Sequence, residues 1–515
     1  MFYLTTAIDY TNGAPHIGHA YEKILADVLC RYHRLRGDDV YFLTGVDQHG
    51  QKVQQSAAKA GVEPPEFVRT VTAQFQELWA RLGLSNDGWA TTTDPRHSRA
   101  VRAILQRLYD AGEIYRGSYQ GAYSVRQEQF LTDKDRAPDG TFGPEWGEVM
   151  EIEETTYYFK VARHRDWLLA FLDAHPDCVR PAFRQAELRN AVERISGDLS
   201  ISRPKARLSW GIELPFDSDY VTYVWFDALV NYITFAGYEA EPGSGLPDFR
   251  RLWPALHVIG KDILIPAHGI YWLTMLKAFG FADADLPRFL VHGFVNIAGG
   301  KMSKSIGNVV DPAVLAETYG PETLRYYLIR ECVVGQDVEF SEDRLVGRYN
   351  TDLANELGNL LNRTLNMARR YRSGVVTRRA VHERDLPAVA EAAVAEYRAR
   401  MDEFQPGLAL EAAWKLAIRC NAFVEENAPW KLAKDPASAD QLDGVLYALA
   451  ESLRILSILI TPVLPTASCA IRTQLALSGS ARLVDGGWGG LSDGHTLGEP
   501  VPVFPRIERA EVAAD

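Results

Sequence analysis

Cysteine is scarce in this chain, and no two cysteines are close enough in sequence to form a C-x-x-C pair. The chain of 515 residues contains Cys30, Cys178, Cys332, Cys420 and Cys469. This scattering argues against a disulfide framework and against a zinc site built from cysteines, and it favours a reducing compartment. We therefore expect the protein to be cytoplasmic.

Long apolar runs are also missing. No stretch reaches the ~18 uncharged apolar residues that a membrane span needs. Residues 453–464 come closest, but Arg454 interrupts them, which favours a core helix. Residues 2–8 have no basic region before them and are followed by Asp9, so they predict a buried strand rather than a signal peptide. We expect no association with membranes.

Basic residues are outnumbered, with 55 Lys and Arg against 67 Asp and Glu and a net charge of −12. Taken alone, this balance disfavours nucleic-acid binding. Residues 346–380 depart from this balance because they contain two acidic residues, Asp352 and Glu356, against seven arginines and no lysine. The arginines are Arg348, Arg363, Arg369, Arg370, Arg372, Arg378 and Arg379. Two interpretations stay open, a solvated helix face and a local basic surface for RNA phosphates.

The N-terminal region has the pattern of a strand, a helix and a second strand. Residues 2–8 and 40–44 are short apolar runs, and residues 20–35 have helical periodicity between them. A βαβ unit of this kind predicts a parallel sheet with ligands at the carboxyl ends of its strands. Further strands of this sheet are expected at residues 220–225, 257–260 and 289–293, and helices dominate from about residue 346.

The first motif, His16-Ile17-Gly18-His19, lies at the expected turn from strand to helix. A helix N-terminus presents free backbone N–H groups and partial positive charge, which suits a phosphate. Gly18 lets a nucleotide approach the backbone closely, and His16 and His19 can donate hydrogen bonds to phosphate oxygens. In isolation, two ordinary turn histidines would explain the motif as well, but its position favours a nucleotide site.

The second motif, Lys301-Met302-Ser303-Lys304-Ser305, follows a pair of glycines much later in the chain. Two lysines on a loop can meet the β- and γ-phosphates of ATP as pyrophosphate leaves, and cations aimed at developing charge accelerate such reactions. The continuation of the segment to residue 312 argues against a plain basic surface loop.

In this order, the two motifs resemble the ATP-handling elements of class I aminoacyl-tRNA synthetases. Further segments narrow the resemblance to methionyl-tRNA synthetases, namely residues 7–10, Asp47, residues 224–232, and residues 260–263 with His268 and Trp272. The resemblance covers nearly the whole chain. It implies an enzyme that activates methionine with ATP and Mg²⁺ and then transfers the methionyl group to tRNA(Met).

The resemblance also implies site residues. The catalytic residues would be His16, His19, Lys301 and Lys304. ATP would contact these and Gly18, Asp262, His292, Gly293 and Ser303. Methionine would contact Ile8, Tyr10, Asp47, Trp225, Ala228, Leu229, Tyr232, Ile263, His268 and Trp272. Aromatic edges suit the polarizable sulfur of methionine, and Asp47 would neutralise its α-ammonium.

In the helical region, the resemblance assigns reading of the anticodon to Asn359, Arg363 and Trp430. Asn359 and Arg363 are four residues apart and share a helix face. Trp430 can stack on a splayed base, which is how proteins read single-stranded loops. Packing at a helix end after Pro429 is the alternative for Trp430. Elongator and initiator tRNA(Met) are both expected partners.

The fold implied is α/β, with a Rossmann-type catalytic domain split by an inserted connective domain and followed by an α-helical anticodon-binding bundle. The halves of the catalytic domain are expected at residues 1–115 and 211–310, with the insertion at 116–210. A stem-contact linker at 311–345, the bundle at 346–480 and a tail at 481–515 that packs back on the body complete the prediction.

The chain departs from many relatives in two places. Ser124 and Gln127 stand where a zinc knuckle would have cysteines, so we expect no zinc. One extra residue lies between Ile263 and His268, although His268 and Trp272 keep their spacing of four residues. The C-terminal dimerisation extension of some relatives is also absent from this sequence, so we expect a monomer.

Two alternatives stay open. A class I synthetase for Leu, Ile, Val or Cys is disfavoured because the insertion is small for an editing domain and a cysteine-based zinc site is missing. A catalytically silent tRNA-binding paralogue is disfavoured by the intact His16, His19, Lys301 and Lys304.

Overall fold

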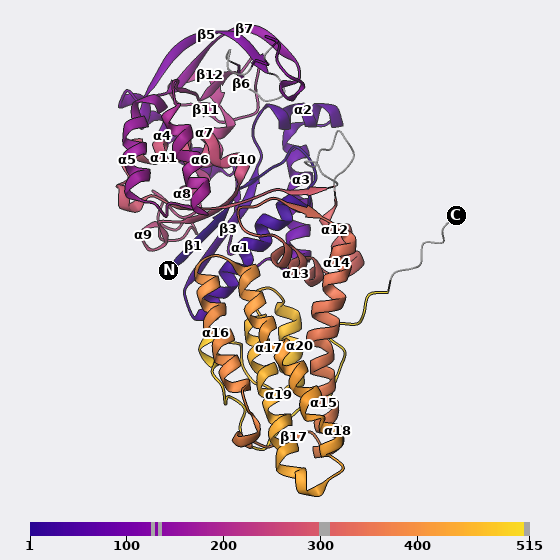
Figure 1. The fold of residues 1–515 in the computed structure, drawn as a ribbon. Helices are drawn as coiled ribbons and strands as arrows, with labels where there is room; N and C mark the ends of the chain where they lie inside the picture. Colours follow the sequence, from indigo (N-terminus) through magenta and orange to yellow (C-terminus); the bar gives the residue numbers. More distant parts are fainter. Residues whose placement is uncertain (125–128, 132–135, 138, 298–309, 509–515) are drawn as a thin grey trace, which may run out of the picture.

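The computed structural model describes residues 1–124, 129–131, 136–137, 139–297 and 310–508. Figure 1 shows an elongated molecule in which an α/β body carries the N-terminal part of the chain and a helical bundle extends away from it. Strands β5 (Ile114–Ser124) and β7 (Val149–Phe159) arch over the end of the body that faces away from the bundle.

The expected parallel sheet forms the centre of the body. Its order is β2-β3-β1-β13-β14-β8, with β4 paired to β3, and every pairing is parallel. The strands are β1 (Phe2–Thr6), β2 (Asp9–Tyr10), β3 (Val40–Asp47), β4 (Gly88–Thr91), β8 (Val179–Arg180), β13 (Leu256–Gly260) and β14 (Arg288–His292). Asp47, Gly260 and His292 therefore each end a strand at the same edge of the sheet, where a ligand is expected.

The inserted region contains a four-stranded antiparallel sheet of order β6-β5-β7-β9, with β6 at Gln129–Phe130 and β9 at Leu199–Ser200. Helices α5 (Arg165–Ala174) and α6 (Ala182–Glu193) follow in the same stretch of chain. Strand β8 lies between them and joins the main sheet beside β14. The insertion therefore contributes an edge strand to the body.

The strand expected at residues 220–225 is wrong as a member of the main sheet. Strand β12 (Asp217–Thr222) pairs in antiparallel fashion with β10 (Ser202–Pro204) and β11 (Glu213–Leu214). After the turn at Tyr223, the chain enters helix α7 (Val224–Leu229). A short apolar run does not reveal which strand it pairs with. One partner here, β10, lies within the residues expected for the insertion.

Helix α1 (Ile17–Arg36) lies beside the central strands and is buried along most of its length. The body also contains α2 (Gln51–Ala60), α3 (Pro64–Arg81), α4 (Pro95–Asp110), α8 (Asn231–Thr234), α9 (Phe249–Leu252), α10 (Lys261–Ile263) and α11 (Leu273–Ala278). Strands β15 (Val295–Ile297) and β16 (Val338–Phe340) form a short parallel pair. In the sequence, β15 precedes and β16 follows the helices α12 (Pro312–Tyr319) and α13 (Pro321–Glu331).

The bundle contains α14 (Glu342–Arg348), α15 (Asn359–Arg372), α16 (Leu386–Asp402), α17 (Pro406–Asn427), α18 (Pro429–Leu432), α19 (Ala439–Leu459) and α20 (Pro465–Gln474). Helix α19 is its core, as expected for residues 453–464, and Arg454 within it binds Glu451 Oε1 at 2.6 Å. None of the helices described is long and apolar enough to cross a membrane.

The last part of the described chain packs along the bundle. The Glu451 carboxylate accepts hydrogen bonds from the backbone N–H groups of Gly489, Gly490 and Leu491. Strand β18 (His495–Thr496) pairs with β17 (Val375–Val376), and Ile507 N donates to Asn350 Oδ1.

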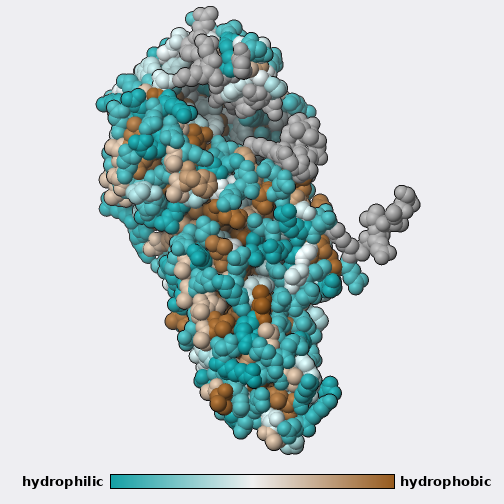
Figure 2. Space-filling model, in the orientation of Figure 1, coloured by the Kyte–Doolittle hydropathy of each residue, from teal (hydrophilic) through white to brown (hydrophobic). Residues whose placement is uncertain are grey.

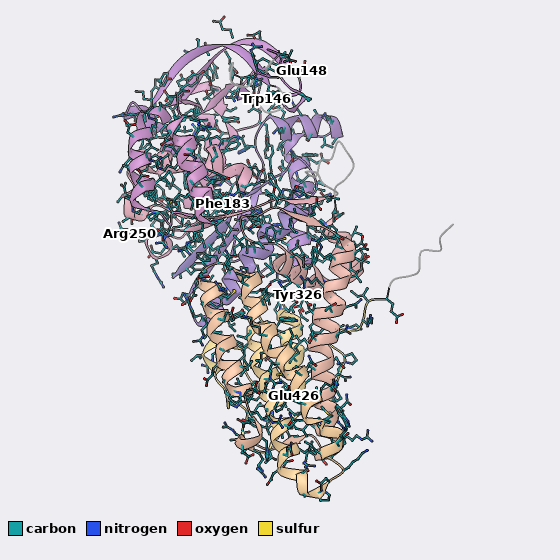
Figure 3. All side chains as sticks on the ribbon, in the orientation of Figure 1. Trp146, Glu148, Phe183, Arg250, Tyr326 and Glu426 are labelled. Atoms are coloured by element: carbon teal, nitrogen blue, oxygen red, sulfur yellow. The ribbon has the colours of Figure 1, made fainter. Side chains whose placement is uncertain are left out.

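Buried polar contacts join the body to the bundle. Arg325 of α13 is 1% exposed and donates to Asp27 Oδ2 of α1 at 2.7 Å. The same guanidinium donates to the carbonyl oxygens of Pro462 and Val463, which follow α19. Figure 3 shows Tyr326 at this junction. The position of α1 is therefore fixed from both sides.

Candidate functional site

A cavity of about 920 Å³ lies at the carboxyl edge of the main sheet, below the insertion. Its lining includes Ile8, Tyr10, Asp47, Trp225, Ala228, Leu229, Tyr232, Ile263 and His268, together with Asp262. Of the residues assigned to methionine from the sequence, only Trp272 is absent from this lining. These side chains come from four separate segments of the chain.

The histidines of the first motif cap helix α1. His16 is the N-cap residue, and its Nδ1 accepts a hydrogen bond from Gly18 N at 3.1 Å. His19 Nδ1 accepts one from His16 N at 3.2 Å, and the two rings stack with centroids 3.7 Å apart. In a neutral ring whose Nδ1 accepts, the proton is on Nε2. Both rings can thus donate from Nε2 at a helix N-terminus, which suits a phosphate.

Asp47, at the end of β3, is buried. Its Oδ1 accepts hydrogen bonds from His49 N at 3.3 Å and from Thr92 Oγ1 at 3.2 Å. Burial and the nearby Asp227 carboxylate raise the pKa of Asp47 to about 8. A cationic group entering the cavity would stabilise the ionised form, so this carboxylate is suited to an ammonium ion.

Asp227 lies behind Asp47 and is fully buried. Its two oxygens contact His49 Nδ1 at 2.6 Å and His97 Nε2 at 2.7 Å. Burial alone would raise the pKa of Asp227, but the two histidines lower it to about 2. For His49, burial lowers the pKa, and the stronger combined attraction of Asp227 and Asp47 raises it overall.

Tyr232 and His268 form a polar contact on an otherwise apolar wall. Tyr232 Oη lies 2.8 Å from His268 Nε2, and His268 Nδ1 lies 2.9 Å from the carbonyl oxygen of Ile263. Burial lowers the pKa of His268 to about 4, so the ring is neutral. Its Nδ1–H donates to the carbonyl, and its Nε2 accepts the tyrosine hydroxyl hydrogen.

Trp272 lies behind this wall. It is fully buried, its ring centroid is 5.8 Å from that of Tyr232, and its Nε1 donates to His257 Nε2 at 3.1 Å. Trp272 therefore supports Tyr232 from behind and does not form part of the cavity surface.

The extra residue between Ile263 and His268 lies in a stretch of chain that contains a kink. After α10, residues Leu264–Trp272 form helical turns that are interrupted at Ile265, which has the extended dihedral angles φ −117° and ψ 121°. His268 lies beyond this kink and still contacts Tyr232.

Tyr10 enters the cavity next to Gly50. A Cβ atom on Gly50 would lie 2.3 Å from Tyr10 Oη, and the backbone there has a φ of +105°. Both the close approach and the positive φ require glycine. On the opposite wall, the rings of Trp225 and Tyr271 meet edge to face with centroids 6.4 Å apart.

A buried ion cluster connects residues 7–9 to α1. Lys23 Nζ donates to Asp9 Oδ1 at 2.5 Å, to Glu22 Oε1 at 2.8 Å and to the carbonyl oxygen of Ala7 at 3.0 Å. Glu22 Oε2 in turn lies 3.1 Å from His292 Nε2. Burial raises the pKa of Asp9 to about 7 in spite of the lysine.

The remaining residues assigned to ATP are only partly covered by the structure. Lys301, Ser303 and Lys304 lie outside the described residues. Gly293 follows β14, and a Cβ atom there would lie 2.1 Å from the carbonyl oxygen of Gln336, so only glycine fits.

The place where many relatives carry a zinc knuckle is also only partly covered by the described residues. Ser124 Oγ donates to the carbonyl oxygen of Trp146 at 2.5 Å, whereas Gln127 lies outside the described residues. In the part of the chain that the structure describes, no group of three or more His, Cys, Asp or Glu side chains could hold a metal ion. The absence of zinc stays a prediction.

At the bundle, the structure brings together two of the three residues assigned to the anticodon. The Arg363 guanidinium lies 5.7 Å from the ring centroid of Trp430 in α18, and its Nη2 donates to Glu425 Oε1 at 2.7 Å. Asn359 is the first residue of α15, one turn before Arg363. Trp430 is half-buried and also packs against the bundle core.

The arginine-rich segment is less basic than its sequence indicates. Figure 2 shows a largely hydrophilic bundle surface. Six of its arginines pair with carboxylates: Arg348, Arg363, Arg369, Arg372, Arg378 and Arg379. These pairs favour the interpretation of a solvated helix face over that of a continuous basic surface.

Sequence reasoning missed the part of the cavity that the insertion lines. Tyr115, Ser118, Tyr158, Asp198, Ser200 and Arg203 all border it. Arg203 is 4% exposed, and its Nη1 donates to Ser200 Oγ at 2.9 Å. No local pattern pointed to these residues, because the folding of the antiparallel sheet over the body brings them to the cavity. Asp227 did lie inside a segment that carried the resemblance, residues 224–232, and His49 lies two residues after Asp47.

Comparison with known proteins gives a consistent result. The model of the family described as tRNA synthetases class I (M) matches residues 2–139 and 146–365. The methionine–tRNA ligase of Deinococcus radiodurans is 42% identical over 519 aligned positions, which cover 98% of this chain and 74% of that protein. The corresponding ligase of Bacillus subtilis is 41% identical and covers 100% of this chain and 79% of its own length.

Solved structures agree with these sequences. Methionyl-tRNA synthetase of Mycobacterium tuberculosis in complex with methionyl-adenylate superimposes with a TM-score of 0.91 at 41% identity, covering 98% of this chain and 99% of that one. The apo form of the same protein gives a TM-score of 0.85 at 37% identity, covering 99% and 98%.

Proposed function

We propose that three parts of this chain, which belongs to the methionyl-tRNA synthetases of class I, carry out different steps of that family's reaction. These parts are the cavity, the histidine cap formed by His16 and His19 at the start of α1, and the tip of the bundle. The chain is a methionine–tRNA ligase. ATP and methionine give methionyl-adenylate and pyrophosphate, and the 3′-terminal adenosine of tRNA(Met) then accepts the methionyl group.

The cavity binds methionine in this proposal. Asp47 takes the α-ammonium, and the neutral Tyr232–His268 pair together with Trp225 and Tyr10 surrounds the thioether. Ile8, Ala228, Leu229 and Ile263 complete the apolar lining. The observation that carries the proposal is the combination of one buried carboxylate and an aromatic wall within one cavity. A polarizable sulfur favours such aromatic contacts.

The capped end of α1 handles the nucleotide. His16 and His19 donate from Nε2 to the α-phosphate as charge moves onto it, and the free backbone N–H groups of the first turn add to the positive potential. Lys301 and Lys304 meet the leaving pyrophosphate, with Ser303 beside them. Asp262, His292, Gly18 and Gly293 contact the nucleoside part. Mg²⁺ accompanies ATP and is held mainly by phosphates and water.

The tip of the bundle reads the anticodon of tRNA(Met). Trp430 stacks on a base, and Arg363 and Asn359 bind base edges, as is typical for recognition of single-stranded RNA loops. Both initiator and elongator tRNA(Met) carry this anticodon and are proposed substrates. The protein is a cytoplasmic monomer without zinc in this proposal. The scattered cysteines support the cytoplasmic location, and Ser124 and Gln127 at the knuckle positions support the absence of zinc.

Amino-acid-dependent exchange of pyrophosphate into ATP tests the specificity. We expect methionine to drive exchange and Leu, Ile, Val and Cys to drive at least tenfold less, because a missing methylene or a lost sulfur contact is worth about 1–3 kcal/mol. Faster exchange with any of these amino acids would contradict the methionine pocket. Absence of exchange with all five would contradict the proposed catalytic roles.

A further inference from the structure

Three ionisable side chains behind Asp47 have no task in the mechanism above. His49, Asp227 and His97 are 6%, 0% and 0% exposed, and the Asp227 carboxylate contacts both rings at 2.6 and 2.7 Å. Buried charges are unfavourable unless they are paired and hydrogen-bonded. Their presence here next to a ligand cavity therefore calls for a functional explanation.

Asp227 links two walls of the cavity. It lies in α7 between Trp225 and Ala228, which line the side-chain part of the cavity. Its partner His49 lies in the loop after β3, and the backbone N–H of His49 donates to Asp47 Oδ1. One chain of contacts thus runs from the wall for the methionine side chain to the carboxylate for its ammonium.

The carboxylate of Asp47 depends on this chain for its orientation. Its two hydrogen bonds, from His49 N and Thr92 Oγ1, are long at 3.3 and 3.2 Å, so neither alone holds it firmly. The ring of His49 is fixed at 2.6 Å to Asp227 and meets Trp210 edge to face at 5.5 Å. Movement of His49 would carry its backbone N–H away from Asp47.

His97 fixes the other oxygen of Asp227. It lies near the start of α4, is fully buried and stacks with Phe235 at 6.0 Å between centroids. With one ring on each oxygen, the Asp227 carboxylate has a single orientation. The six-residue helix α7 is thereby tied to α4 and to the loop after β3.

We propose that Asp227, acting through His49, is a positioning residue that sets the separation between the ammonium-binding carboxylate of Asp47 and the side-chain wall on α7. The pair thereby selects amino acids by the distance between their ammonium group and their side chain. This inference rests on the proposed role of Asp47 in binding the α-ammonium.

The test removes the protein contact and the ligand ammonium in turn. Asp227→Asn keeps the shape of the side chain but loses an acceptor for one of the histidines. Dissociation constants are measured for methionine and for its α-hydroxy analogue, which lacks the ammonium. We expect the variant to bind methionine about 10- to 100-fold more weakly, the range known for removing the hydrogen-bond partner of a metal-ligating residue. It should bind the hydroxy analogue within about twofold of the original protein. Equal losses for both ligands would overturn the proposal.

A second pair of variants keeps the proposal testable if Asp227→Asn does not fold. Asparagine can replace the Nδ1–H donor of histidine, so His49→Asn should retain most of the methionine affinity, whereas His49→Leu should lose it. Similar affinities for these two variants would also overturn the proposal.

Two controls separate this inference from the function on which it rests. Glu113→Gln breaks another histidine–carboxylate pair, in which His164 Nε2 lies 3.2 Å from Glu113 Oε2. Neither residue lines the cavity, so this substitution should change the affinity neither for methionine nor for the hydroxy analogue. Asp47→Asn should weaken methionine and spare the hydroxy analogue. If Asp47→Asn spared both ligands, the proposed ammonium site itself would be wrong, whatever Asp227→Asn shows.

Discussion

The cavity and the tip of the bundle place their charged groups in opposite environments. Around the cavity, Asp47, Asp227 and Lys23 are buried and coupled to further ionisable groups. At the tip, Arg363 pairs with Glu425, whose side chains are 29% and 62% exposed. Oppositely charged side chains therefore form a coupled network at one end of the molecule and an exposed surface pair at the other.

The difference matches the two kinds of ligand. A small amino acid must be held in one position. Removing one partner of a buried ion pair strongly destabilises a protein, so a buried network keeps its charged groups in place. An RNA loop must displace whatever its binding groups already contact. Exposed pairs contribute about 0–1 kcal/mol, so an arginine can exchange a carboxylate for a base or phosphate at little loss.

The largest effect at the tip is expected from Trp430→Ala. Loss of base stacking is worth about 1–3 kcal/mol, so the KM for tRNA should rise accordingly while methionine-dependent exchange of pyrophosphate stays unchanged. Both rates are measured with the same preparation. Trp488→Ala removes another half-buried tryptophan of the bundle, one that donates to Glu383 Oε2, and serves as the control. If exchange fell together with charging, Trp430 would be a packing residue and the contrast between the two ends would weaken.

The buried end should respond to pH. Because the pKa of Asp47 is raised to about 8, this side chain is largely protonated at pH 6 in the ligand-free protein, whereas the methionine ammonium needs the carboxylate. Methionine affinity should therefore rise about tenfold per pH unit between pH 6 and 7 and level off above 8. In the same range the Asp47 side chain binds more protons in the ligand-free fold than in the unfolded chain, so the contribution of Asp47 to the stability of the ligand-free protein falls as the pH rises.

Titration calorimetry with methionine between pH 6 and 8.5 measures this dependence. Asp47→Asn removes the titrating group and should flatten the profile. A steep rise that persisted in Asp47→Asn would assign the proton to another group of the cavity.

The smallest effect is expected from Glu425→Gln. The substitution frees Arg363 from its carboxylate, so tRNA affinity should increase by no more than about fivefold, and the melting temperature should hardly change because exposed pairs contribute less than about 1 kcal/mol. Binding is measured by filter retention at low salt. Glu396→Gln breaks the exposed pair of Glu396 with Lys415 and should leave tRNA affinity unchanged. Weaker binding by Glu425→Gln would show that this glutamate contacts the RNA itself.

Much of the molecule could be predicted from local sequence. The family, the α/β fold and the parallel sheet are confirmed, because buried strands and the strand-to-helix motif leave strong local signals. The strand at residues 220–225 was assigned to the wrong sheet, since pairing depends on distant segments. Trp272 was expected in the cavity but supports its wall from behind.

Other features of the site could not be read from the sequence at all. The contribution of Arg203 and Tyr115 arises only when the insertion folds over the body. The chain of contacts from Asp47 through His49 and Asp227 to His97 joins three segments that are far apart in sequence. The roles of Lys301 and Lys304 stay predictions.

The histidine cap of α1 has a consequence for how mutations there are interpreted. His16 and His19 each use Nδ1 to accept a hydrogen bond within the first helical turn, so a phosphate would be contacted through Nε2. Replacement by alanine removes both roles at once, so a lost rate would combine an unwound helix end with a missing proton donor. At His16, the N-cap residue, asparagine would preserve the turn without donating from the position of Nε2, because asparagine is among the strongest N-cap residues. Only such a substitution distinguishes the architecture of the helix start from its chemistry.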